Sequence, residues 1–187
     1  MRHLSYLIDR FPEAPYYLLS ITYLLFQPPA DSIYLFSGAL IFVVLSFGLG
    51  VALKLALKTE RPNYYCSLPA VEYDVPSLHT LVSLGGAAYV YTVNPHYGFV
   101  LFPIALAYMY ARLESGFHSK KAVFVGAVLG VSLGYLFSIV NLFLFLPVAA
   151  RTMLAVLFFA LPPFTVAFRL KHVKIGSLDD LPVHQKV

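Results

Sequence analysis

Six long apolar segments dominate this chain and leave few architectures open to it. A helix needs about 20 mainly apolar residues to cross the hydrocarbon core of a bilayer, and backbone groups in lipid must satisfy one another. Each segment is therefore expected to be a helix. The expected fold is an all-α, polytopic transmembrane bundle of about six helices. The segments cover about Ala14–Pro29, Ser32–Leu57, Ser77–Val93, Tyr97–Arg112, Ala122–Leu146 and Thr152–Phe168.

The composition supports a membrane protein over a soluble domain. Charged residues make up 12% of the 187 residues and hydrophobic ones 59%, whereas a soluble domain is about 25% charged. The single cysteine, Cys66, excludes an intramolecular disulfide. A formal charge of +4 is modest and indicates membrane topology or anionic lipid, with no nucleic-acid partner expected. We expect one domain over residues 1–187, with a polar tail at 169–187.

Lysine and arginine are distributed unevenly between the two expected sides of the membrane. If all six segments span, Arg151 alone lies on one side and the other 12 of the 13 basic residues lie on the opposite side. Cytoplasmic loops carry the excess of basic residues in membrane proteins. The count predicts a multi-pass protein of the cell membrane with both termini and the candidate site on the cytoplasmic face.

Three glycines recur every four residues in the fifth segment. Gly126, Gly130 and Gly134 would share one helix face, where a second helix backbone can approach closely. Packing inside the monomer is the first interpretation of this face. A homodimer contact is the alternative.

Basic residues inside or beside apolar segments are costly in a bilayer and indicate function. The first cluster is Lys54, Lys58 and Arg61, spaced four and three apart, so that one helix face would carry all three. Pro62 is then expected to end the helix. The alternative is that these side chains only reach out to the membrane surface and anchor the helix end.

Two further clusters would lie on the same side of the membrane as the first. Pro76-Ser77 before an apolar run indicates a helix start, whose free amides attract anions, and His79 would lie in its first turn. The third cluster, Arg112 and His118, flanks the next polar stretch. Arginine and lysine bind phosphate oxygens, and histidines can attack phosphorus or protonate a leaving oxygen. The set predicts phosphoryl transfer. Because no residues have metal-ligand spacing, we expect no metal and no cofactor.

With these motifs the chain resembles the type 2 phosphatidic acid phosphatase superfamily of integral membrane lipid phosphatases. That family carries Lys-x6-Arg-Pro, then Pro-Ser-x-His, then Ser-Arg-x5-His-x3-Asp. The resemblance spans about residues 54–134. The corresponding residues are Lys54-x6-Arg61-Pro62, Pro76-Ser77-Leu78-His79 and Ala111-Arg112-x5-His118-x3-Ala122.

The resemblance implies a metal-free lipid phosphatase or pyrophosphatase. His118 matches the nucleophile that forms a phosphohistidine, and His79 matches the general acid. The phosphate-binding positions of the family correspond to Lys54, Arg61, Ser77 and Arg112. Family members remove terminal phosphate from lipids such as phosphatidic acid, phosphatidylglycerol phosphate and polyprenyl pyrophosphates. The implied partner is therefore a membrane lipid phosphate in the bilayer.

Two positions depart from the family pattern. Ala111 replaces a serine, and Ala122 replaces the aspartate that orients the nucleophilic histidine. Loss of an orienting carboxylate can cost on the order of 10⁴ in turnover. Three explanations follow: a natural impaired member, an engineered inactive form, or a substitute carboxylate. Glu114, four residues before His118, is the candidate substitute.

Other functions are compatible with the same expected fold. The chain could bind phospholipid without turnover, or it could transfer a lipid head group to an alcohol, since Pro-Ser-Leu-His also resembles the motif of sphingolipid-type synthases. A transporter fits less well because the charges gather at one face and not at the midplane. Many members of the resembling family place their site on the outer or lumenal face, in contrast to the cytoplasmic face that the charge count predicts.

Overall fold

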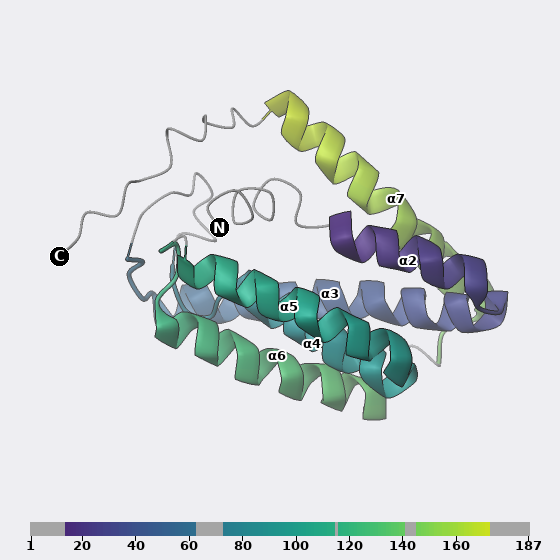
Figure 1. Cartoon of the computed structure of the whole chain (residues 1–187), viewed down its shortest axis with the longest axis horizontal. Coiled ribbons are helices and arrows are strands. Elements are labelled where there is room, and N and C mark those ends of the chain that lie inside the picture. Colours follow the sequence, from purple (N-terminus) through teal and green to yellow (C-terminus); the bar gives the residue numbers. More distant parts are fainter. Residues whose placement is uncertain (1–13, 63–72, 115, 141–144, 173–187) are drawn as a thin grey trace.

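A computed structural model describes residues 14–62, 73–114, 116–140 and 145–172 of the chain. Within these ranges the chain forms helices and no strand, which confirms the all-α fold class (Figure 1). The helices are α2 (Ala14–Phe26), α3 (Pro29–Leu57), α4 (Leu78–Val93), α5 (Pro95–Glu114), α6 (Lys120–Val140) and α7 (Val148–His172).

Prolines and caps explain most of the helix boundaries. Pro29 and Pro95 are the first residues of α3 and α5, where a missing amide hydrogen costs nothing. Ser77 is the N-cap of α4, as the sequence predicts, and Asn94 is its C-cap. Pro162 and Pro163 lie inside α7, which continues to residue 172. The first four residues of the expected tail at 169–187 therefore belong to α7, and residues 173–187 lie outside the described ranges.

Helix α4 occupies the centre of the bundle and contacts α3, α5 and α6. Ten of its 16 residues are buried. Aromatic rings fill the interior around it: Tyr89 stacks on Phe42 with ring centroids 6.1 Å apart and meets Phe137 edge-on at 5.4 Å. Because α4 carries the second motif at its N-terminus, this burial gives the motif a rigid support.

The glycine face of α6 packs directly against α4. A Cβ atom added to Gly130 would lie 2.4 Å from the Leu81 carbonyl oxygen, and one added to Gly134 would lie 2.2 Å from the Gly85 carbonyl oxygen. At Gly126 the corresponding neighbour is the Ser77 carbonyl oxygen, at 2.7 Å. Only glycine permits this backbone-to-backbone contact. The interpretation as packing within the monomer is confirmed, and α4 covers the face.

Three of the described helices are long and apolar enough to cross a membrane. These are α3, α6 and the part of α7 from Val148 to Thr165. Their outward surfaces expose large apolar side chains such as Val44, Phe124 and Phe164, which a soluble monomer rarely gathers in such number. Helix α2 is apolar but shorter, with 13 residues. The expectation of six spans stays a prediction.

We expect Gly130→Ala to destabilise the chain because its methyl group would meet the Leu81 carbonyl oxygen. The measurement is the thermal unfolding temperature in detergent. Gly48→Ala is the matched control, since a Cβ atom at Gly48 meets nothing within 4 Å and alanine in a helix interior gains up to about 1 kcal/mol over glycine. Equal or higher stability of Gly130→Ala would contradict the close contact of α4 and α6.

Candidate functional site

The loops at one end of the bundle meet and bring the three sequence motifs together. Figure 1 shows the C-terminal ends of α3 and α5 beside the N-terminal ends of α4 and α6. Thr59, just after α3, ties down the segment before α4. Its carbonyl oxygen accepts the Asp74 amide at 2.8 Å, and its hydroxyl accepts the Val75 amide at 2.9 Å. The end of the first motif is thereby joined to the start of the second.

Lys54 is fully buried at 0% exposure and points its ammonium group into this junction. Its Nζ donates to the carbonyl oxygens of Tyr73 and Asp74, the latter at 2.9 Å. Arg61 Nε also donates to the Tyr73 carbonyl oxygen, at 3.1 Å. A buried ammonium is costly unless it is hydrogen-bonded, and these carbonyl groups supply part of that compensation. Lys54 is therefore not a membrane-surface anchor.

The expected common helix face of Lys54, Lys58 and Arg61 is wrong. Helix α3 ends at Leu57, and Lys58 follows in the left-handed conformation with φ of 47°. Lys58 is exposed, whereas Lys54 is buried. The chain turns back at this point to pair with the segment before α4, so Arg61 reaches the Tyr73 carbonyl oxygen from a loop and not from the helix.

The second motif begins α4 against the first turn of α6. The Ser77 amide donates to the Ala122 carbonyl oxygen at 3.0 Å, and the Ser77 hydroxyl accepts from the Thr80 hydroxyl at 3.0 Å. Ser77 makes no side-chain cap for the α4 amides. His79 is half-buried in the first turn of α4, as the sequence predicts. Second and third motifs thus share a direct backbone contact.

His118 lies between α5 and α6 and contacts a buried carboxylate. Its Nδ1 is 2.8 Å from Asp74 Oδ1, and His118 and Asp74 are only 6% and 2% exposed. Asp74 Oδ2 accepts the Ser119 hydroxyl at 2.5 Å, and the Ser119 amide lies 3.3 Å from Oδ1 and 3.4 Å from Oδ2. Gly116, with φ of 66°, forms the turn that leads from α5 into this segment.

The protonation states at the site follow from burial and from neighbouring charges. Burial acts to raise the pKa of Asp74, but hydrogen bonds from His118 and Ser119 outweigh it and hold that pKa below its usual value. Burial lowers the pKa of His118 to about 4. The hydrogen bond to Asp74 opposes this change, while the positive charges of Arg61 and Lys54 reinforce it. At neutral pH the pair is thus a carboxylate and a neutral imidazole.

Asp74 is the residue that sequence reasoning missed. It follows no spacing rule of the three motifs and stands between the first and the second motif. The only local signal is its position three residues before Ser77. The sequence offers Glu114 as the substitute carboxylate, but the structure places Asp74 at Nδ1 of His118. Glu114 ends α5 and is half-buried.

The structure also places the remaining site residues. Arg112 is buried at 7% exposure in the last turn of α5, and Ala122 is fully buried in the first turn of α6. The contacts described above bring together five of the predicted site residues: Lys54, Arg61, Ser77, His118 and Ala122. Among the described residues, no three His, Cys, Asp or Glu side chains gather as a metal site would require. For Tyr64 and Tyr65 the sequence offers two interpretations, anchoring at the membrane interface first and the lining of a substrate entrance second, and both residues lie outside the described ranges.

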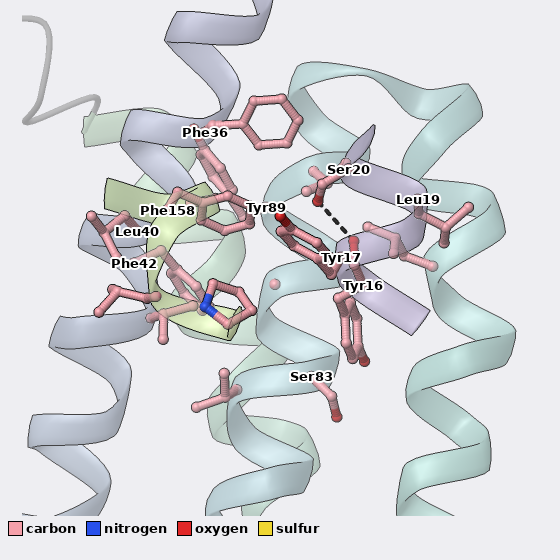
Figure 2. Close-up of a pocket in the computed structure, with 18 of the residues that line it drawn as sticks. Tyr16, Tyr17, Leu19, Ser20, Phe36, Leu40, Phe42, Ser83, Tyr89 and Phe158 are labelled. Atoms are coloured by element: carbon pink, nitrogen blue, oxygen red, sulfur yellow. Dashed lines mark hydrogen bonds between the residues drawn. The ribbon is translucent and has the colours of Figure 1, made fainter. Parts of the chain in front are cut away.

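A cavity of about 470 Å³ runs from the start of α4 into the bundle. Figure 2 shows Tyr16 and Leu19 of α2, Phe36 of α3, Tyr89 of α4 and Phe158 of α7 around it. Its lining is largely apolar and aromatic, and His79 contributes to it. The cavity therefore joins a histidine of the second motif to an apolar interior.

Comparison with family models, with curated proteins and with solved structures finds no match for this chain.

We expect the His118 imidazole to titrate with a midpoint near pH 4 in place of its usual 6.5. Histidine NMR of the isotope-labelled chain in detergent measures this midpoint. Arg61→Gln should raise it because a positive charge near the ring is removed, while Lys58→Gln, which removes an exposed charge of the same sign, should leave it unchanged.

The same shift affects folding stability. The unfolded chain binds a proton near pH 6.5 that the folded chain binds only near pH 4, so the folded state loses stability as the pH falls between these values. A His118 midpoint at or above pH 6.5 would contradict the buried, neutral imidazole.

Proposed function

We propose that this chain is a membrane lipid phosphatase or pyrophosphatase that removes a terminal phosphate through a phosphohistidine. The observation that carries the proposal is the meeting of three distant segments at one end of the bundle. Lys54 and Arg61 reach the backbone just before Ser77, and His118 contacts the same loop. Positive charge, a helix N-terminus and a neutral histidine are the parts that phosphoryl transfer needs.

The proposed reaction uses the two histidines in different roles. Because Nδ1 of His118 faces Asp74, its Nε2 is the nitrogen left to attack phosphorus. A new N–P bond forms, the bond from phosphorus to the leaving lipid oxygen breaks, and His79 gives that oxygen a proton. Water then attacks the phosphohistidine, phosphate leaves, and the water proton returns to His79. The lowered pKa of His118 favours the attack because the ring is neutral at pH 7.

The basic residues would hold the phosphate oxygens during transfer. The positive charges of Arg61 and Lys54 lower the pKa of His118. The electric field of these two residues therefore reaches the ring that would attack phosphorus. Arg112, in the last turn of α5, and the Ser77 end of α4 would complete the phosphate site. Three of these proposed donors, Lys54, Arg61 and Ser77, come from the first two motifs. Lys54 and Ser77 are fully buried, so little water competes with phosphate for their hydrogen bonds.

A lipid substrate fits the apolar surroundings of this site. The cavity lined by His79 extends past Leu40, Phe42 and Tyr89 between the helices and would accept a hydrocarbon tail while the head group lies at the loops. The proposed location is the cell membrane. The count of basic residues supports a cytoplasmic face for the site and both termini.

The central test is phosphate release from phosphatidic acid, phosphatidylglycerol phosphate and a polyprenyl pyrophosphate by the detergent-purified chain. We expect His118→Asn to lower turnover at least about 10³-fold, because it removes the nucleophile. His96→Asn, an exposed histidine at the opposite end of α5, is the matched control and should keep full activity.

Unchanged turnover in His118→Asn would show that the nucleophile is wrong. Binding of these lipids without release of phosphate would favour the phospholipid-binding alternative. Transfer of phosphate to an added alcohol in preference to water would favour a transferase.

Filling the cavity tests the position of the lipid tail. Gly86 lines the cavity, and a Cβ atom at this position meets nothing within 4 Å. We expect Gly86→Leu to raise KM at least tenfold for long-chain lipid phosphates and to leave KM for a short, water-soluble phosphate ester unchanged. Gly48→Leu, also in open space but outside the cavity lining, is the control. Equal KM values of Gly86→Leu and Gly48→Leu on long-chain lipids would place the tail elsewhere.

A further inference from the structure

Hydrogen bonds at both its amide and its carbonyl group hold the backbone of Asp74 in place. Its amide donates to the Thr59 carbonyl oxygen at 2.8 Å, and its own carbonyl oxygen accepts Lys54 Nζ at 2.9 Å. Thr59 lies just beyond the end of α3, and Lys54 in its last turn. Residues of the first motif therefore fix the backbone of Asp74 and with it the direction of its side chain, independently of the contacts that the carboxylate makes.

The carboxylate of Asp74 uses its two oxygens for two different partners. Oδ1 lies 2.8 Å from His118 Nδ1, and Oδ2 accepts the Ser119 hydroxyl at 2.5 Å. The Ser119 hydroxyl also accepts the Ala122 amide at 3.1 Å, so it caps the first turn of α6. One carboxylate oxygen contacts the histidine, and the other contacts the serine that caps the start of α6.

Position 122 cannot serve His118 in the manner of the resembling family, because it holds alanine. Ala122 is 0% exposed, its amide is bound to Ser119, and its carbonyl oxygen accepts the Ser77 amide at 3.0 Å. A carboxylate introduced at position 122 would be buried, on a residue whose amide is bonded to the same serine that Asp74 contacts. Two buried carboxylates linked through the same serine would repel each other, whereas one is held by its hydrogen bonds.

We propose that Asp74 is the positioning residue for His118, and that it does from the loop before α4 what the resemblance assigns to position 122. This inference rests on the proposed function. Asp74 Oδ1 accepts the Nδ1 hydrogen of His118 and thereby presents Nε2 to phosphorus. When Nε2 gains the phosphoryl group the ring becomes positively charged, and the adjacent carboxylate stabilises that charge. The chain with Ala122 is then a complete site and not a disabled one.

The experiment compares the intact chain with Asp74→Asn, Ala122→Asp and the double variant, by phosphate release and KM in detergent. We expect Asp74→Asn to lower kcat on the order of 10³- to 10⁴-fold with KM changed less than threefold, because the lipid contacts remain. Ala122→Asp alone should not raise kcat. The double variant should recover kcat at least tenfold over Asp74→Asn, since a single carboxylate again lies beside the ring.

Ser119→Ala separates positioning from support of the helix. It removes the Oδ2 partner and the α6 cap but leaves the contact of Oδ1 with His118, so we expect kcat within tenfold of the unmodified chain. Two results would overturn the proposal. One is a kcat of Asp74→Asn within tenfold of the unmodified chain or equal to that of Ser119→Ala. The other is a tenfold or greater gain in kcat from Ala122→Asp alone. This second result can be measured even if Asp74→Asn does not fold.

A second readout does not depend on activity. Nitrogen-15 NMR of the histidine rings in the unmodified chain should show His118 protonated at Nδ1 and bare at Nε2. If no tested lipid releases phosphate while this tautomer is found, the proposed function fails and the positioning by Asp74 stands. If His118 carries its proton on Nε2, the positioning by Asp74 fails whatever the activity.

Discussion

The backbone contact between α4 and α6 is the constraint on which the candidate site depends. The glycines of α6 let its backbone lie against the carbonyl oxygens of Ser77, Leu81 and Gly85. Any larger side chain on this face would separate the two helices. Since α4 carries the second motif at its first residues and α6 begins just after His118, this contact brings the two motifs to one place. The Ser77 amide and the Ala122 carbonyl oxygen, 3.0 Å apart, mark where they meet.

Burial gives this junction its chemical character. Lys54 is fully buried and Asp74 nearly so, and both are charged groups compensated by hydrogen bonds. His118 contacts the Asp74 carboxylate and is neutral at physiological pH, because burial and the nearby positive charges lower its pKa to about 4. In water these groups would interact weakly, but inside a low-dielectric junction each strongly affects the others. A neutral imidazole on a carboxylate, with a lysine and an arginine near it, is the arrangement on which the proposed phosphoryl transfer rests.

The helices could be predicted well because their signals are local. Apolar runs and the polar Asn94 at the end of α4 act on the few residues around them. The expected second and fourth segments nevertheless start after Pro29 and Pro95, which begin α3 and α5. The common face expected for Lys54, Lys58 and Arg61 failed because it assumed that α3 continues to Pro62. The left-handed conformation of Lys58 ends the helix at Leu57. The chain then turns back to Tyr73 and Asp74, a contact between distant residues that spacing does not reveal.

The sequence by itself determined the all-helical class, the order of the helices and the close packing face of α6, and it supplied the basic residues and histidines that we propose for phosphoryl transfer. Each of these depends on composition or on spacings of a few residues. Only the tertiary structure decided which carboxylate contacts His118. Asp74 is 44 residues away in the chain, and it reaches the ring because Thr59 and Lys54 hold its backbone in the junction of three loops. A side chain's partner across such a distance depends on how the helices pack, which motif spacing alone does not encode.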